Sequence, residues 1–91
     1  MRVIRHTSQF KRDFKRISRR NKDVSKLKAV IDTLAHDGIL PRSHHDHPLV
    51  GVYRGTRECH IEPDWLLIYA YEEPNDLILV RTGSHSDLFK K

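Results

Sequence analysis

The segment RECHIEPDWLLIYAY, residues 57–71, decides the fold of this chain. Residues 65–71 are apolar on both faces of an extended backbone, which is typical of a strand in the middle of a sheet. The first part of the segment alternates instead, so Cys59 and Ile61 share one face and His60 takes the other. If Cys59 and Ile61 meet the core, His60 points to the opposite, open face of the sheet.

Further strands are expected on both sides of this segment. Residues 51–54 and 77–81 are short apolar runs bounded by turn residues, so they predict two more strands. Because these strands follow one another closely, they predict an antiparallel meander. A β-branched run at residues 2–6 predicts a first strand, and residues 39–48, with two prolines and three histidines, predict an ordered loop.

Two amphipathic helices are expected between the first strand and the meander. Phe10, Phe14 and Ile17 recur at intervals of four and three, so they form one apolar stripe. Asp23 can cap a second helix, and Gly38 supplies its stop. The second helix repeats the pattern at four positions: Val24, Leu27, Ile31 and Leu34. The two helices predict a hairpin whose apolar seam packs on the sheet.

The expected fold class is therefore α+β. An N-terminal strand and a helical hairpin pack on a small, mainly antiparallel sheet, and the whole chain, residues 1–91, forms one domain. The run Ser84-His85-Ser86-Asp87 has the form of a capping box, which predicts a short last helix ending with Leu88, Phe89 and two lysines. His85 would then lie in the first turn of that helix.

Charge is distributed unevenly along the chain. The first 28 residues hold eleven Lys and Arg against two Asp, whereas the remainder is acidic. Such a field attracts a polyanion or an acidic protein, although a solvated helix surface is the alternative. We expect Lys11, Lys15 and Arg19 to contribute to substrate binding. The single cysteine excludes an intrachain disulfide, and no segment has the ~20 apolar residues that span a bilayer, so we expect a cytoplasmic protein.

Five of the seven histidines lie between residues 44 and 85: His44, His45, His47, His60 and His85. Imidazole exchanges protons near neutral pH, so histidines beside Asp64 and Arg81 indicate general acid–base catalysis on a phosphodiester. A metal site in residues 44–47 is less favoured, because adjacent loop residues seldom converge on one ion. We expect His44 and His45 to be solvated and His47 to be held in place.

Three segments, DHPL at 46–49, CHIEPDWLLIY at 59–69 and RTGSHSDLF at 81–89, closely resemble the YafQ branch of the RelE/ParE toxin superfamily. The resemblance implies a RelE-like microbial RNase fold and a bacterial type II toxin. Such a toxin is an endoribonuclease that cuts mRNA on the translating ribosome and is inhibited by a cognate antitoxin protein. The functional positions of the family fall on seven residues here: His47, His60, Asp64, Trp65, Arg81, His85 and Phe89.

These residues suggest a mechanism that needs no metal and no cofactor, because RNA carries its own nucleophile in the 2′-hydroxyl. We expect His85 to be the general acid. The general base is Asp64 or His60, with His47 as the third candidate, and Arg81 stabilises the transition state. Trp65 and Phe89 would shape the pocket or stack on a base.

Three other activities stay open at this point. The first is a metal-dependent enzyme that uses the loop at 44–47. The second is a ParE-like toxin that inhibits gyrase, since the superfamily contains gyrase poisons with the same fold. The third is a non-catalytic module that binds nucleic acid or protein through its basic helices. The histidines favour the nuclease.

Overall fold

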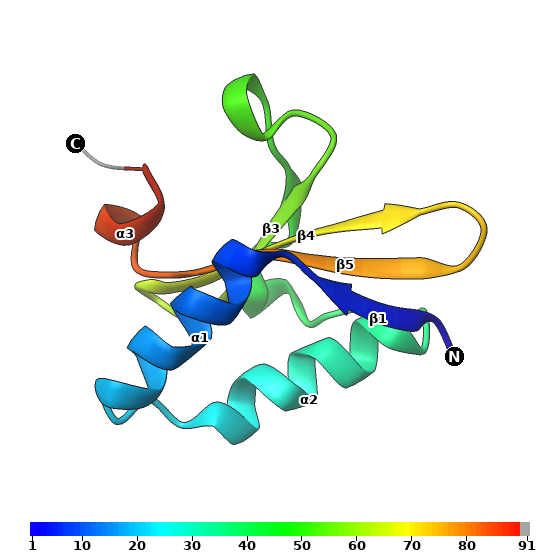
Figure 1. Ribbon diagram of the computed structural model, residues 1–91. Coiled ribbons are helices and arrows are strands. Elements are labelled where there is room, and N and C mark those ends of the chain that lie inside the picture. The colour runs from blue at the N-terminus through cyan, green and yellow to red at the C-terminus, as the bar shows by residue number, and fades with distance from the viewer. Residues whose placement is uncertain (90–91) are drawn as a thin grey trace.

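The computed structural model describes residues 1–89, in which five strands form one sheet in the order β1-β5-β4-β3-β2 (Figure 1). The strands are β1 (Val3–His6), β2 (His47–Pro48), β3 (Arg57–Glu62), β4 (Trp65–Glu72) and β5 (Asp76–Gly83). Only β1 runs parallel to its neighbour, β5, and all other pairs are antiparallel. The expected α+β fold is confirmed, with the apolar strand β4 at the centre of the sheet.

The prediction of a strand at residues 51–54 is wrong. Residues Gly51–Tyr53 form a single 3-10 turn, η2, which begins at a left-handed Gly51 with φ +70°. The strand at this edge is β2, which lies inside the segment expected to be a loop and pairs with the start of β3. Val50 and Val52 are 85% and 97% exposed, so these apolar residues have no buried face to support a strand.

Helices α1 (Ser8–Arg19) and α2 (Val24–Ala35) cover one face of the sheet, as Figure 1 shows. Thr7 caps α1 by accepting the N–H of Phe10, and Asp23 caps α2 by accepting the N–H of Ser25. The helix α2 ends at Ala35, before the expected stop at Gly38. The core beneath both helices contains Phe10, Ile17, Leu27, Leu34, Cys59, Ile61 and Trp65. The expected inward face of β3 is therefore confirmed.

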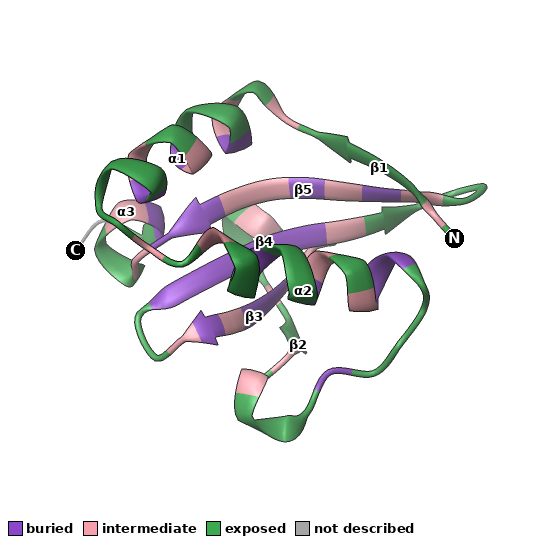
Figure 2. Ribbon diagram, turned by 90° about the horizontal axis from the view of Figure 1, so that it is seen from below, coloured by how far each residue is buried: buried purple, intermediate pink, exposed green. Residues whose placement is uncertain are grey.

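The opposite face of the sheet was expected to be open, but it is partly covered. The short helix α3 (His85–Phe89) and the η2 turn lie over it, and a second apolar cluster unites Leu66, Ile68 and Leu88 with Leu49, Tyr53 and Val80. Figure 2 shows buried residues along β4, the central strand of the sheet. His60 therefore lies at the margin of a covered surface, and its side chain is 20% exposed.

The capping box at the start of α3 is confirmed. The Ser84 hydroxyl accepts the N–H of Asp87 at 3.1 Å, and the Ser84 N–H donates to the Asp87 carboxylate at 2.9 Å. Arg20 adds a salt bridge of 2.6 Å to Asp87, which ties α3 to the end of α1. The two final lysines lie outside the described residues. Within residues 1–89 no helix is long and apolar enough to cross a membrane.

Candidate active site

His85 and Asp64 form a hydrogen-bonded pair at the start of α3. One Asp64 oxygen accepts both the backbone N–H of His85 at 2.9 Å and its Nδ1–H at 2.6 Å. These two bonds lower the pKa of Asp64, since both favour the charged carboxylate. Because Nδ1 is engaged, the ring presents Nε2 to solvent, and its side chain is about half exposed.

His47 lies between two hydrogen-bond acceptors. Its Nδ1 is 2.5 Å from the carbonyl oxygen of His45, and its Nε2 is 3.1 Å from a carboxylate oxygen of Glu58. A carbonyl oxygen only accepts, so Nδ1 carries hydrogen, while Nε2 faces the Glu58 carboxylate. Glu58 is buried, and its other oxygen has no hydrogen-bond partner among residues 1–89. Both ring nitrogens of His47 therefore already face acceptors within the protein.

His60 lies between two other imidazole rings. Its ring centroid is 5.7 Å from that of His85 and 5.4 Å from that of His45, both in edge-to-face arrangements. Its Nε2 is 4.0 Å from Glu58, which is beyond hydrogen-bond range. Among the expected catalytic histidines, His60 and His85 are thus brought together, and each keeps a ring nitrogen that can exchange a proton.

Arg81 is held by a buried carboxylate at the edge of β5. Its guanidinium donates to both oxygens of Asp13 at 2.8 and 3.0 Å, and Asp13 also accepts the N–H of Thr82. Burial raises the pKa of Asp13, but the hydrogen bonds from Arg81, Gln9 and Thr82 outweigh it and leave this pKa below its usual value. The remaining Arg81 nitrogen lies 3.5 Å from the hydroxyl of Tyr53.

This position of Arg81 follows from the length of β1. The first strand pairs with β5 only as far as Leu79, so within residues 1–89 the last residues of β5 pair with β4 on one side and have no strand on the β1 side. Thr7 and Asp13 of the α1 region instead bond to Val80, Thr82 and Arg81. Much of the positive charge of Arg81 is consequently balanced within the fold, and one end of its guanidinium stays directed toward Tyr53.

The two expected aromatic residues differ in exposure. Trp65 is 1% exposed and donates its indole N–H to Thr82, so it supports the sheet and is not accessible to a base. Phe89 is 36% exposed, and its ring meets that of Tyr53 edge to face at 5.8 Å. The two roles considered for these residues were shaping the pocket and stacking on a base. Burial favours the first role for Trp65, and exposure favours the second for Phe89.

Tyr53 and Glu58 were not identified from the sequence. Tyr53 belongs to the segment interpreted as a strand, and only the η2 turn brings it to Arg81 and Phe89. Glu58 had a usable signal, because the alternation of β3 placed it on the same face as His60. A glutamate on the outer face of a sheet is ordinarily solvated, however, and its burial depends on the loop that β2 brings over it.

The loop that precedes β2, residues 43–46, is held by specific bonds. His44 is half-buried and donates Nδ1–H to the carbonyl oxygen of His60 at 2.6 Å, so the expectation that it is solvated is wrong. His45 is exposed, as expected, but its ring contacts that of His60. Asp46 accepts the hydroxyl of Tyr69 at 2.7 Å and the Nε–H of Arg57 at 3.2 Å.

The basic residues Lys11, Lys15 and Arg19 lie along α1 and are all exposed. None of the salt bridges found within residues 1–89 involves them. Their charge is therefore available to a partner. Across the same described residues, no cluster of three or more His, Cys, Asp or Glu side chains has the geometry to hold a metal ion.

The whole chain is similar to known proteins. The model of a family described as "Bacterial toxin of type II toxin-antitoxin system, YafQ" matches residues 2–90. The mRNA interferase toxin YafQ of Escherichia coli K12 is 40% identical over 89 residues, which cover 97% of this chain and 96% of that protein. The E. coli DinJ-YafQ complex contains a chain with a TM-score of 0.89 and 40% identity, covering 98% of this chain and 99% of the other. A metal-bound toxin from Helicobacter pylori has a TM-score of 0.91 and 39% identity, covering 98% and 100%.

Proposed function

Because the chain belongs to the YafQ family of bacterial type II toxins, we propose that it cuts mRNA on the translating ribosome by metal-free acid–base catalysis. It is an endoribonuclease of the mRNA interferase class, as its relatives are named. The observation that carries the proposed mechanism is the contact between the rings of His60 and His85, at 5.7 Å between centroids. One phosphodiester can span two imidazoles at this separation.

The reaction needs two proton transfers. The 2′-hydroxyl oxygen attacks the neighbouring phosphorus and loses its proton to a general base. The bond from phosphorus to the 5′-oxygen breaks, and a general acid gives that oxygen a proton. The products are a 2′,3′-cyclic phosphate and a 5′-hydroxyl, so the bonds and protons balance without a metal or a cofactor.

The hydrogen bonds support one choice for each of the two roles. Asp64 already accepts two hydrogen bonds from His85, and both nitrogens of His47 face acceptors. His60 is the remaining base candidate, and it approaches the 2′-hydroxyl. His85, whose Nδ1 is fixed by Asp64, protonates the 5′-oxygen through Nε2. Arg81 and the hydroxyl of Tyr53 lie at the η2 side of the site, where Arg81 stabilises charge on the phosphate.

The basic face of α1 supports the proposed partners. Lys11, Lys15 and Arg19 are exposed, so they can bind ribosomal RNA by charge and position the site over the message. The same surface suits an acidic segment of a cognate antitoxin protein, and a YafQ relative is known in complex with the protein DinJ. Action on translating ribosomes places the protein in the cytoplasm.

One substrate change tests the mechanism. A message programmed on ribosomes is prepared with ribose or deoxyribose 5′ of the scissile bond, and cleavage is followed with and without EDTA. We expect the ribose message to be cut equally in both conditions and the deoxyribose message to survive. Cutting of the deoxyribose message rejects the 2′-hydroxyl mechanism, and loss of activity in EDTA favours a metal-dependent enzyme. Growth arrest with intact mRNA and damaged DNA would instead favour a gyrase poison.

A further inference from the structure

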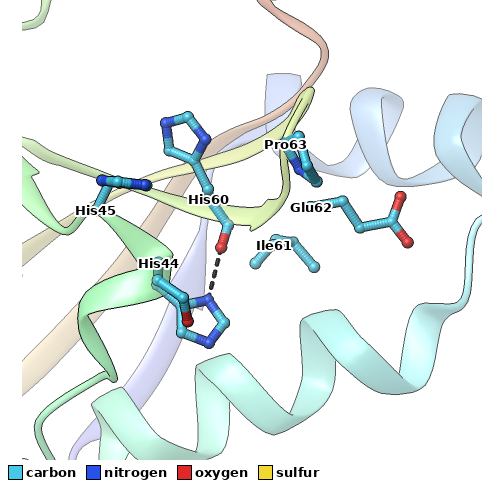
Figure 3. Close-up of a pocket in the computed structure, with 7 residues that line it drawn as sticks. His44, His45, His60, Ile61, Glu62 and Pro63 are labelled. Atoms are coloured by element: carbon cyan, nitrogen blue, oxygen red, sulfur yellow. Dashed lines mark hydrogen bonds between the residues drawn. The ribbon is translucent and has the colours of Figure 1, made fainter.

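A cavity of about 490 Å³ lies beside His60, on the side of the loop at residues 43–45 (Figure 3). It is lined by Ser43, His44, His45, His60, Ile61, Glu62 and Pro63. We propose that this cavity binds the unpaired base of the mRNA nucleotide on the 5′ side of the scissile bond. The inference rests on the proposed function and adds to it the position at which the sequence of the message is selected.

The walls of the cavity suit a flat, partly polar ring. Two imidazoles, those of His45 and His60, stand at an interplanar angle of 65°, and Ile61 and Pro63 add apolar surface. Any of the four nucleobases can stack on such aromatic and apolar groups. At the margin the Ser43 hydroxyl can distinguish the edge of one base from another, whereas both carboxylate oxygens of Glu62 are held by Lys22 and Lys26.

The edge of β3 is also accessible at this point. The strand β2 pairs only with Arg57 and Glu58, so within residues 1–89 the second half of β3 pairs with β4 on one side and has no strand on the β2 side. His44 uses the carbonyl oxygen of His60 on this edge, as the dashed line in Figure 3 shows. In the same view the ring of His60 points away from α2. The cavity therefore lies where backbone and side-chain groups can both reach a bound base.

The loop is built to hold its shape. His45 has a left-handed backbone with φ 47°, which is uncommon for a residue other than glycine and is often found at functional sites. His44 fixes one side of it by its bond to His60, and Asp46 fixes the other by its bonds to Tyr69 and Arg57. Burial and the neighbouring Asp46 raise the pKa of Tyr69, so its hydroxyl remains a donor. The cavity is thus formed before substrate binds.

The position of His60 sets the direction of the message. His60 contacts His45 within the cavity and His85 outside it, so its ring separates the cavity from the proposed acid. The base that takes the proton from a 2′-hydroxyl must lie next to the nucleotide 5′ of the cut. That nucleotide is therefore the one beside the cavity. The nucleotide 3′ of the cut lies toward His85, where Phe89 is exposed.

Abasic messages test this assignment. Ribosomes are programmed with a message that is intact, abasic 5′ of the cut, or abasic 3′ of the cut, and cleavage rates are compared. For the wild-type protein we expect the 5′ abasic message to be cut about tenfold more slowly, the size of one lost stacking contact. The ratio compared is the cleavage rate of the intact message divided by that of the abasic message. We expect His45→Ala to reduce the 5′ ratio, and Ser43→Trp, which fills the cavity from an exposed position, to bring it to one. The 3′ abasic ratio should not change in either variant.

His36→Ala, at an exposed histidine following α2, is the matched control and should keep the wild-type ratios. The inference is overturned if both loop variants keep the wild-type 5′ ratio, or if they alter the 3′ ratio instead. Failure of the proposed mechanism is seen separately, because the wild-type protein would then cut the deoxyribose message whatever the abasic ratios are. Ser43→Trp keeps the test valid if His45→Ala does not fold.

Discussion

Nδ1 of His85 lies 2.6 Å from Oδ1 of Asp64, and the same oxygen accepts the backbone N–H of His85. One carboxylate oxygen therefore fixes both the tautomer of the ring and its place at the start of α3. Asp64 was expected to be a candidate base, but its two hydrogen bonds favour a role as a positioning residue for His85. Its effect on cleavage should consequently act through the ring.

Replacing Asp64 should reduce cleavage without unfolding the protein. Asp64→Ala removes the acceptor for His85, and we expect a loss of between about 10- and 10⁴-fold in kcat, the range for a carboxylate that orients a reactive histidine. Asp64→Asn keeps an acceptor oxygen and should retain more activity. Because Asp64 is exposed, the stability measured by urea unfolding should stay close to that of the wild-type protein. Equal activity of both variants and wild type would contradict the role.

His85→Ala should abolish cleavage while ribosome binding persists. Loss of one proton-transfer group costs about 10²–10⁴-fold, whereas the basic residues of α1 remain in place. Cosedimentation with ribosomes and cleavage of a translated message measure the two properties. His60→Ala should likewise lose cleavage and keep ribosome binding. A triple variant with Ala at Lys11, Lys15 and Arg19 should instead lose ribosome binding while its catalytic groups stay in place. Normal cleavage by His85→Ala would show that another group is the acid.

His47 and Glu58 should be coupled in stability. His47→Ala leaves the buried Glu58 carboxylate without its nearest donor, which should lower the free energy of unfolding by about 1–3 kcal/mol. In the Glu58→Leu variant, whose leucine suits the apolar cluster on this face, His47→Ala should lower the free energy of unfolding much less. Urea unfolding of the four proteins in this cycle gives the coupling. Additive effects would mean that the two side chains do not interact.

Arg81→Ala should be a strongly destabilising change. It leaves Asp13, which is fully buried, without its bidentate partner, and breaking such a buried pair costs about 3–5 kcal/mol. Arg5→Ala is the control, because it breaks an exposed salt bridge to Asp76 and should cost about 1 kcal/mol or less. Thermal and urea unfolding compare them. Equal losses would show that the Asp13 pair contributes no more than a surface pair does.

Acid should weaken the attachment of α3. The hydrogen bond from Arg20 lowers the pKa of Asp87 well below its usual value, so its stabilising effect is complete above the unfolded value of about 3.9. This stabilisation is lost as the pH falls through the lower folded pKa. Urea unfolding at pH 7, 4 and 2.5 should show a steeper acid loss in wild type than in Asp87→Asn. Arg20→Ala should reproduce the flatter profile, and an unchanged slope in both variants would contradict this account.

Periodicity was sufficient for most of the fold. The strands β3 and β4, both helices and the Ser84–Asp87 capping box follow from local patterns, because the spacing of apolar and capping residues in each segment records which face is buried and where the helix begins. The error at residues 51–54 has a different origin. Val50 and Val52 resemble strand residues, but the Gly51 turn and the absence of a surface to cover them decide the local structure.

The candidate active site could be predicted only in part from the sequence, for a similar reason. The motifs identified His60, Asp64 and His85, which the structure brings together. Whether His47 can serve as a base depends on Glu58, and whether Trp65 can stack depends on its burial. Both facts come from contacts between distant segments, which spacing along one chain does not specify. The hydrogen-bond partners therefore changed the assignment of roles more than the choice of residues.

The attachment of α3 has a consequence for how the protein loses activity. This five-residue helix buries only Leu88 and is otherwise held by its cap, by Arg20 and Asp64, and by the contact of Phe89 with Tyr53, although it carries His85. A helix so short has little stability of its own. Its local opening requires much less free energy than unfolding of the sheet. Warming or salt should thus silence the protein reversibly while the core remains folded, so a fold-sensitive probe alone would overestimate the active fraction.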